Sequence, residues 1–139
     1  MVQIIAGEKG KGKTKLLLDT ANESVKTAHG SIVYIDKSTK HMYELNRNIR
    51  LINLFEYPVH SYEAFMGFIG GIISQDHDLE IVYLDSFLKL SHLSAEEISQ
   101  AVLDLGKLGE KFGLRFVLSV SEDISNIPED VHEYIVHSL

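Results

Sequence analysis

Short apolar segments alternate with longer amphipathic segments along this chain. The apolar segments are rich in aliphatic, β-branched and aromatic residues, which is typical of strands buried in a sheet. They predict strands at residues 2–6, 31–36, 49–57, 80–86, 114–121 and 133–139. Between them, apolar residues recur at helical spacing and predict helices at residues 14–28, 61–74 and 94–112, with a short helix at 40–46.

Strands that alternate with amphipathic helices predict a mainly parallel sheet with helices on both faces, an α/β fold of three α/β/α layers. No repeat, low-complexity tract or linker-like segment interrupts the alternation, so we expect residues 1–139 to form one domain. Gly67, Gly70 and Gly71 lie inside a predicted helix and lower its intrinsic stability. We interpret them as sites of close packing or of a helix break, with a partner interface as the alternative.

A glycine-rich segment, GEKGKGKT, follows the first predicted strand and opens the first predicted helix. It matches the pattern G-x-x-x-x-G-K-[ST] at Gly7, Gly12, Lys13 and Thr14. Glycines allow the backbone N–H groups to turn towards an anion, and a helix start adds a partial positive charge. We therefore expect this loop to bind the phosphates of a nucleotide, with Lys13 on the β- and γ-phosphates and the Thr14 hydroxyl on Mg²⁺.

The expected nucleotide-binding residues form one continuous stretch. They are Gly7, Glu8, Lys9, Gly10, Lys11, Gly12, Lys13, Thr14 and Lys15.

Besides the Thr14 hydroxyl, a carboxylate on a neighbouring strand is needed to hold the hydrated Mg²⁺. Four apolar residues followed by Asp85 have the Walker B form, so Thr14 and Asp85 are the expected metal ligands. Asp36 ends a similar strand and competes for this role. We prefer Asp85, because a helical segment and the strand at 114–121 follow it in the expected order.

Composition and charge narrow the classes of function. Among 139 residues the formal net charge is -7, which disfavours a general nucleic-acid binder. There is no cysteine, no apolar run long enough to span a bilayer, and no signal-peptide pattern at the start. We expect a cytoplasmic protein without membrane insertion.

With these motifs in this order, the chain resembles the RecA-like branch of P-loop ATPases. The resemblance covers nearly the whole chain, although only the P-loop itself is a highly specific motif. It implies a sheet in which the P-loop strand lies beside the strand that follows Walker B. It also implies binding of ATP with Mg²⁺ and assembly with further copies or a protein partner.

The chain departs from this family at the residue that activates water. Family members commonly carry a glutamate just beyond the second strand, but this sequence continues there from Asp36 into Lys37. Other P-loop ATPases carry a glutamate directly after the Walker B aspartate, but this sequence has Ser86 at that position. Asp36 is a shorter substitute, and the expected catalytic residues are therefore Lys13, Asp36 and Asp85. We interpret Glu122 and Asp123, the further candidates, as exposed loop charges.

Two serines near the end of the strand at 114–121, Ser119 and Ser121, occupy the place where such folds often sense the γ-phosphate. Serine there is equally typical of ordinary strand-end polarity.

These features favour an ATP-binding RecA-like protein with slow or partner-dependent hydrolysis, acting as a nucleotide-controlled switch or assembly subunit. A small-molecule kinase and an interaction module with a vestigial P-loop are the alternatives. The sequence leaves open the partner, the oligomeric state and the choice between ATP and GTP.

Overall fold

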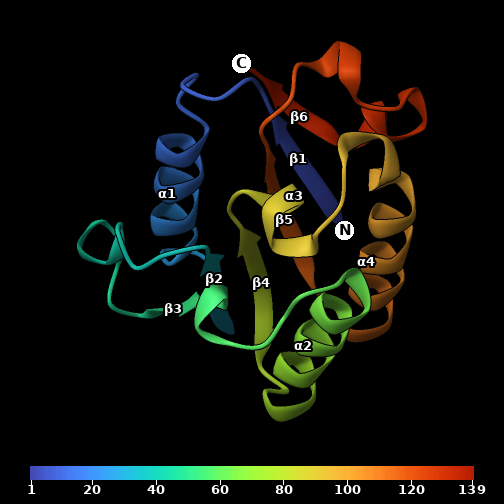
Figure 1. Cartoon of the computed structure of the whole chain (residues 1–139). Coiled ribbons are helices and arrows are strands. Elements are labelled where there is room, and N and C mark those ends of the chain that lie inside the picture. The colour runs from blue at the N-terminus through green and yellow to red at the C-terminus, as the bar shows by residue number, and fades with distance from the viewer.

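A six-stranded sheet forms the centre of the protein in the computed structural model, which describes residues 1–139 (Figure 1). The strands lie in the order β3-β2-β4-β5-β1-β6, and every neighbouring pair is parallel. Their bounds are β1 Val2–Ala6, β2 Ser31–Asp36, β3 Ile49–Asn53, β4 Leu79–Leu84, β5 Arg115–Val120 and β6 Ile135–Ser138. The first strand, β1, lies between β5 and β6, as the resemblance implied for the P-loop strand.

Helices cover both faces of this sheet, which confirms the predicted three-layer α/β/α architecture. The helices are α1 Lys13–Ser24, α2 Tyr62–Gln75, α3 Phe87–Ser91 and α4 Ile98–Phe112. Helix α1 covers one face and packs Leu17 and Ala21 against a cluster of 10 buried residues. Helices α2, α3 and α4 cover the other face, where Phe65, Phe87 and Ile98 join a cluster of 26. No helix is both long and apolar enough to cross a membrane.

Several predicted boundaries are wrong because local hydrogen bonds end the elements earlier. The strand predicted at 49–57 ends at Asn53, whose side chain accepts the Phe55 N–H and starts the 3₁₀ helix Leu54–Glu56. Helix α1 ends at Ser24 rather than 28, and the Ser24 hydroxyl donates back to the Ala21 carbonyl. The capping box of Ser94 and Glu97 is confirmed, although it opens a 3₁₀ turn that leads into α4.

The glycines of α2 do not have the expected structural reason. Helix α2 runs unbroken through Gly67, Gly70 and Gly71, and a Cβ built at any of the three meets nothing within 4 Å. The interpretation as close packing or a helix break is therefore wrong.

Gly30, by contrast, lies where two backbone segments touch. Its added Cβ would meet the Asp78 carbonyl oxygen at 2.0 Å, and the N–H of Ser31 donates to that same oxygen at 2.8 Å. The Gly30 N–H also donates to the Glu80 carboxylate at 2.9 Å. The start of β2 therefore aligns against the start of β4 only because residue 30 has no side chain.

We expect Gly30→Ala to destabilise the fold by about 1–3 kcal/mol or more, because backbone must move to admit the methyl group. The matched control is Gly67→Ala, which we expect to stabilise α2 by about 0.5–1 kcal/mol because it adds helix propensity without a clash. Urea unfolding of both variants measures the difference. Equal stability of the two would contradict the close approach at Gly30.

Candidate functional site

The carboxyl ends of β1, β2, β4 and β5 meet at one edge of the sheet, and an open cleft of about 310 Å³ lies there. Parallel sheets of this kind bind ligands beyond these strand ends. No hydrophobic side chain lines the cleft. The lining residues are Lys9, Gly10, Gly12, Lys13, Thr14, Lys15, Asp36, Lys37, Ser38, Lys40, His41, Asp85, Ser86 and Ser121.

The glycine-rich loop connects β1 to α1 and forms one wall of the cleft. Gly10 and Gly12 have φ values of 88° and 91°, which residues with a Cβ rarely adopt. Gly12 also caps α1, so the helix begins directly at Lys13 and its free N–H groups lie at the cleft. Glycine therefore permits the backbone conformation of this loop at both positions.

Lys13 folds back over this loop. Its Nζ donates to the Glu8 carbonyl oxygen at 2.9 Å, and only 6% of the residue is exposed. Burial lowers the pKa of Lys13 below its ordinary value, while the Asp85 charge acts in the opposite direction. An anion in the cleft would supply the counter-charge that the protein gives Lys13 only in part.

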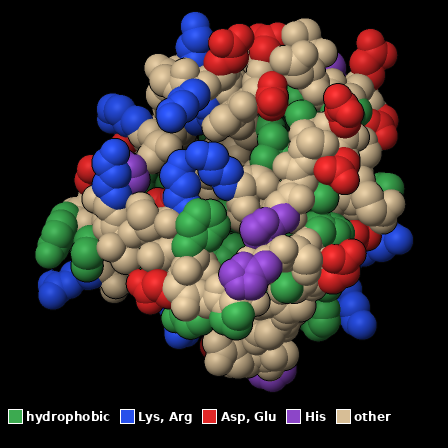
Figure 2. Space-filling model, viewed as in Figure 1, with side chains coloured by type: hydrophobic (Ala, Val, Ile, Leu, Met, Phe, Trp, Pro, Cys, Tyr) green, Lys and Arg blue, Asp and Glu red, His purple; other side chains and the backbone are tan.

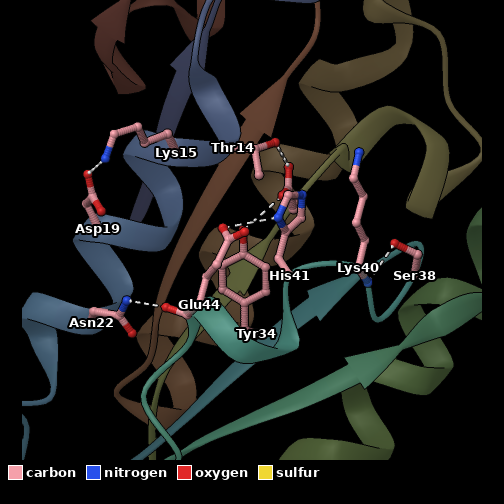
Figure 3. A network of polar contacts seen from close by, with 10 residues as sticks. Thr14, Lys15, Asp19, Asn22, Tyr34, Ser38, Lys40, His41 and Glu44 are labelled. Carbon is pink, nitrogen blue, oxygen red and sulfur yellow. Dashed lines mark hydrogen bonds and ion pairs between the residues drawn. The ribbon is translucent and has the colours of Figure 1, made fainter.

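The other residues of the loop differ in their surroundings. Lys9 lines the cleft, whereas Lys11 is exposed and does not line it. Lys15 points from the first turn of α1 and pairs with Asp19 at 3.0 Å (Figure 3). Gly7 closes the end of β1, and its N–H donates to the Val120 carbonyl.

Asp85 follows β4 and lies buried at the base of the cleft. Three hydroxyl groups from three elements donate to its carboxylate: Thr14 of α1 at 3.3 Å, Tyr34 of β2 at 2.9 Å and Ser119 of β5 at 2.9 Å. Its own N–H donates to the Ile35 carbonyl and extends the ladder between β2 and β4. The carboxylate that the sequence selected therefore contacts the P-loop threonine directly.

Tyr34 is a member of this network that the sequence did not single out. Burial, together with the charge and hydrogen bond of Asp85, raises the pKa of its hydroxyl far above the ordinary value. The hydroxyl therefore stays protonated and donates to Asp85. Tyr34 lies opposite Tyr83 in the sheet register, and their stacked rings are 6.1 Å apart between centroids. Its position two residues before Asp36, on the same face of the strand, was the available signal.

Asp36 ends β2, one strand away from Asp85 and also at the cleft. It is 3% exposed, and its Oδ1 accepts the N–H of Lys37 at 2.7 Å. Burial, and after it the Asp85 charge, raises the pKa of Asp36 above its ordinary value. No hydrogen bond joins Asp36 to Thr14, so the two competing carboxylates have different positions relative to the P-loop.

The four other candidates from the sequence, two serines and two acids, differ in whether they reach the cleft or Asp85. Ser119 contacts Asp85 and also accepts the N–H of Ser86 at 2.8 Å, while Ser121 lines the cleft. Glu122 accepts from Asn126, and Asp123 accepts from the backbone N–H and hydroxyl of Ser125. Neither acid lines the cleft.

The connection between β2 and β3 forms a second wall of the cleft. The sequence predicted no functional residue in this connection beyond Asp36. This connection is bound to α1, because the Asn22 side chain donates to the Glu44 carbonyl at 2.8 Å (Figure 3). The same side chain accepts the N–H of Asn46 at 2.7 Å. It carries Lys37 and Lys40 at the cleft. Only the tertiary structure brings these lysines opposite the P-loop.

Comparison with protein-family models and with curated protein sequences gives no match. Among solved structures, the chain is similar to the flagellar accessory protein FlaH from Methanocaldococcus jannaschii, with a TM-score of 0.63 and 14% sequence identity. The similarity covers 94% of this chain and 64% of FlaH, so this chain spans less than two thirds of that protein's length. The likeness supports the α/β/α fold.

The raised pKa of Asp36 has a consequence for stability. Its carboxyl group loses its proton more readily in the unfolded chain, where the ordinary value is 3.8, than in the folded protein. The stability contributed by Asp36 is therefore lost as the pH rises from that value through the folded pKa. We expect Asp36→Asn to stabilise the protein at pH 7 by about 0.5–2 kcal/mol, the usual range for relief of strain at a site.

Chemical unfolding from pH 3 to pH 8 checks this, and the advantage of the variant should vanish towards the acid end. The matched control is Asp19→Asn, which removes an exposed carboxylate in a surface ion pair and should change stability by less than about 1 kcal/mol. A less stable Asp36→Asn protein at pH 7 would contradict the prediction.

Proposed function

We propose that this protein binds ATP together with Mg²⁺ at the loop formed by residues 7–15. It hydrolyses the nucleotide slowly or only with a partner, and it acts as a nucleotide-controlled switch or assembly subunit. The proposal includes a cytoplasmic location, where nucleoside triphosphates are available. The observation that carries it is the contact of Thr14, the first-turn hydroxyl of a glycine-rich loop, with the buried carboxylate of Asp85.

The donor groups at this point fit Mg²⁺. Mg²⁺ prefers oxygen ligands and is commonly bound through one or two protein groups with substrate phosphates and water. The Thr14 hydroxyl and the Asp85 carboxylate supply such oxygens, and Ser119 and Tyr34 fix the orientation of the carboxylate. A bound Mg²⁺ would neutralise part of the charge on the phosphates.

Lys13 and the loop backbone would bind the phosphates from the other side. The ammonium already lies inside the loop, so it needs only to exchange the Glu8 carbonyl for a phosphate oxygen. Free N–H groups at the start of α1 add donors and a partial positive charge. Because positioning and charge dominate phosphoryl transfer, these groups would supply binding and part of the stabilisation of the transition state.

The carboxylates at the cleft support slow hydrolysis. Only Asp36 and Asp85 line it, and no glutamate does. Asp85 is engaged by three hydroxyl donors, and Asp36 is almost fully buried with an elevated pKa. Neither is an exposed carboxylate that is free to act as a base on water. A partner or a second copy would have to supply one. FlaH, the similar structure, is described as an accessory protein, which agrees with a role in an assembly.

Calorimetric titration with Mg·ATP and Mg·GTP, followed by phosphate release from the same sample, tests the proposal. We expect ATP binding with very slow release. We also expect Lys13→Ala to bind ATP at least about tenfold more weakly, because it removes a charged hydrogen-bond donor. The control Lys26→Ala removes an exposed lysine, paired with Glu23, beyond the far end of α1. Failure of the wild-type protein to bind either nucleotide would contradict the proposal and favour the interaction module.

The two carboxylates should differ in their effect on Mg²⁺. We expect Asp85→Asn to remove most of the gain in ATP affinity that Mg²⁺ gives over EDTA, whereas Asp36→Asn should keep it. The ratio of the two affinities is the measurement, because a general loss of stability does not change it selectively. The reverse order would identify Asp36 as the Mg²⁺-binding carboxylate.

A further inference from the structure

Lysines gather around the cleft without acidic partners. On the face seen in Figure 2, Lys and Arg side chains cluster between α1 and α3. The protein has three ion pairs, and none of them involves Lys9, Lys37, Lys40 or Lys89. Figure 3 shows Lys40 extended with its ammonium group free of any marked contact, while its backbone N–H is bonded to Ser38. A protein with a net charge of -7 thus concentrates unpaired cations at one place.

Lys37 and Lys89 are neighbours within this group. Lys37 extends from the end of β2, and its Nζ donates to the Ser86 hydroxyl at 3.3 Å. Lys89 lies on α3, three residues after Ser86. The neighbouring Lys37 ammonium lowers the pKa of Lys89, and Lys9 of the P-loop adds a smaller contribution. Two ammonium groups side by side repel each other, so a bound anion between them would be stabilised by both.

The position of Lys37 and Lys89 indicates which anion would bind between them. Lys37 lines the same cleft as Lys13 and Thr14 but comes from the β2 side. Ser86, its hydrogen-bond partner, directly follows Asp85, the proposed Mg²⁺-binding carboxylate. A phosphate chain that ran from the P-loop towards Asp85 would bring its terminal phosphate towards Lys37, and Lys89 lies beside Lys37. A diphosphate has one phosphate fewer and would end closer to the P-loop.

We infer that Lys37 and Lys89 bind the terminal phosphate of the nucleoside triphosphate and give the protein its preference for triphosphate over diphosphate. This inference rests on the proposed nucleotide binding at residues 7–15. In place of a base that would activate water, the end of β2 then carries a cation that holds the unhydrolysed terminal phosphate.

The backbone around Lys89 supports a ligand-binding role. Ser86 and His92 have φ values of 59° and 60°, and they are the only residues other than glycine with positive φ. They flank α3 on either side. Such backbone strain concentrates in ligand clamps and switch regions. The His92 ring also hydrogen-bonds the Val59 carbonyl at 2.9 Å, so a shift of α3 would reach the segment before α2.

Calorimetric titrations with Mg·ADP and with the Mg²⁺ complex of β,γ-imido-ATP, which resists hydrolysis, test the inference. We expect the wild-type protein to bind the triphosphate analogue at least about tenfold more tightly than ADP, as charged hydrogen bonds to one phosphate allow. In Lys37→Ala/Lys89→Ala this ratio should fall to within about threefold, with ADP affinity changed much less. Lys37→Arg should retain most of the preference, because it keeps the charge and the donors.

The control Lys26→Ala removes the same charge at a distance. With 12 residues in α1, it lies about 18 Å or more from the cleft and should leave the ratio unchanged. An unchanged ratio in the double variant, or equal weakening of both nucleotides, would overturn the inference while nucleotide binding stands. A wild-type protein that binds both nucleotides equally would also overturn it alone. Binding of neither nucleotide would overturn the proposed function and this inference together.

Discussion

The buried carboxylate of Asp85 is held by hydroxyl groups from α1, β2 and β5, and the geometry of the cleft depends on this interaction. A carboxylate removed from water is costly unless hydrogen bonds replace its hydration. Thr14, Tyr34 and Ser119 provide that replacement, and each can do so only if its own element has docked correctly. The same contacts that compensate the buried charge therefore align the P-loop with β4. The cleft is preorganised because its formation and the burial of Asp85 are one event.

Charge is distributed unevenly around this cleft. Asp36 and Asp85 lie buried on adjacent strands, whereas Lys9, Lys37 and Lys40 line the cleft without forming an ion pair. Such an arrangement is not optimal for the empty fold, since like charges are close together within each group. Under the proposed function, Mg²⁺ at Asp85 and a phosphate chain beside the lysines would offset this repulsion. Functional sites often lower stability in this way, and the rest of the structure compensates.

The fold alone does not identify an activity, because similar α/β folds carry many functions. The similarity to FlaH at 14% identity concerns the arrangement of the elements. The case for a nucleotide switch comes instead from residues: an intact P-loop lysine and threonine, a Walker B carboxylate in contact with that threonine, and the lack of a free carboxylate base. Lys37, which follows β2, agrees with the lack of a free carboxylate base. A lysine at this position would favour retention of a terminal phosphate over activation of water.

The sequence by itself determined most of the helices and strands and the P-loop side of the site. β1 and β2 have the predicted bounds, because apolar periodicity and flanking glycines act locally. The positive φ values at Gly10 and Gly12 follow from local chain chemistry in the same way. Beyond the pairing of β1 with β5, which the resemblance implied, tertiary structure decided which strands are neighbours, and it decided that Tyr34 and Ser119 meet Asp85. It also decided the formation of α3 and the place of Lys37 opposite the P-loop. These depend on contacts between residues far apart in the chain. Lys37 and Ser86, for example, are 49 positions apart, and they meet because β2 pairs with β4 in the register that places Ile35 beside Leu84.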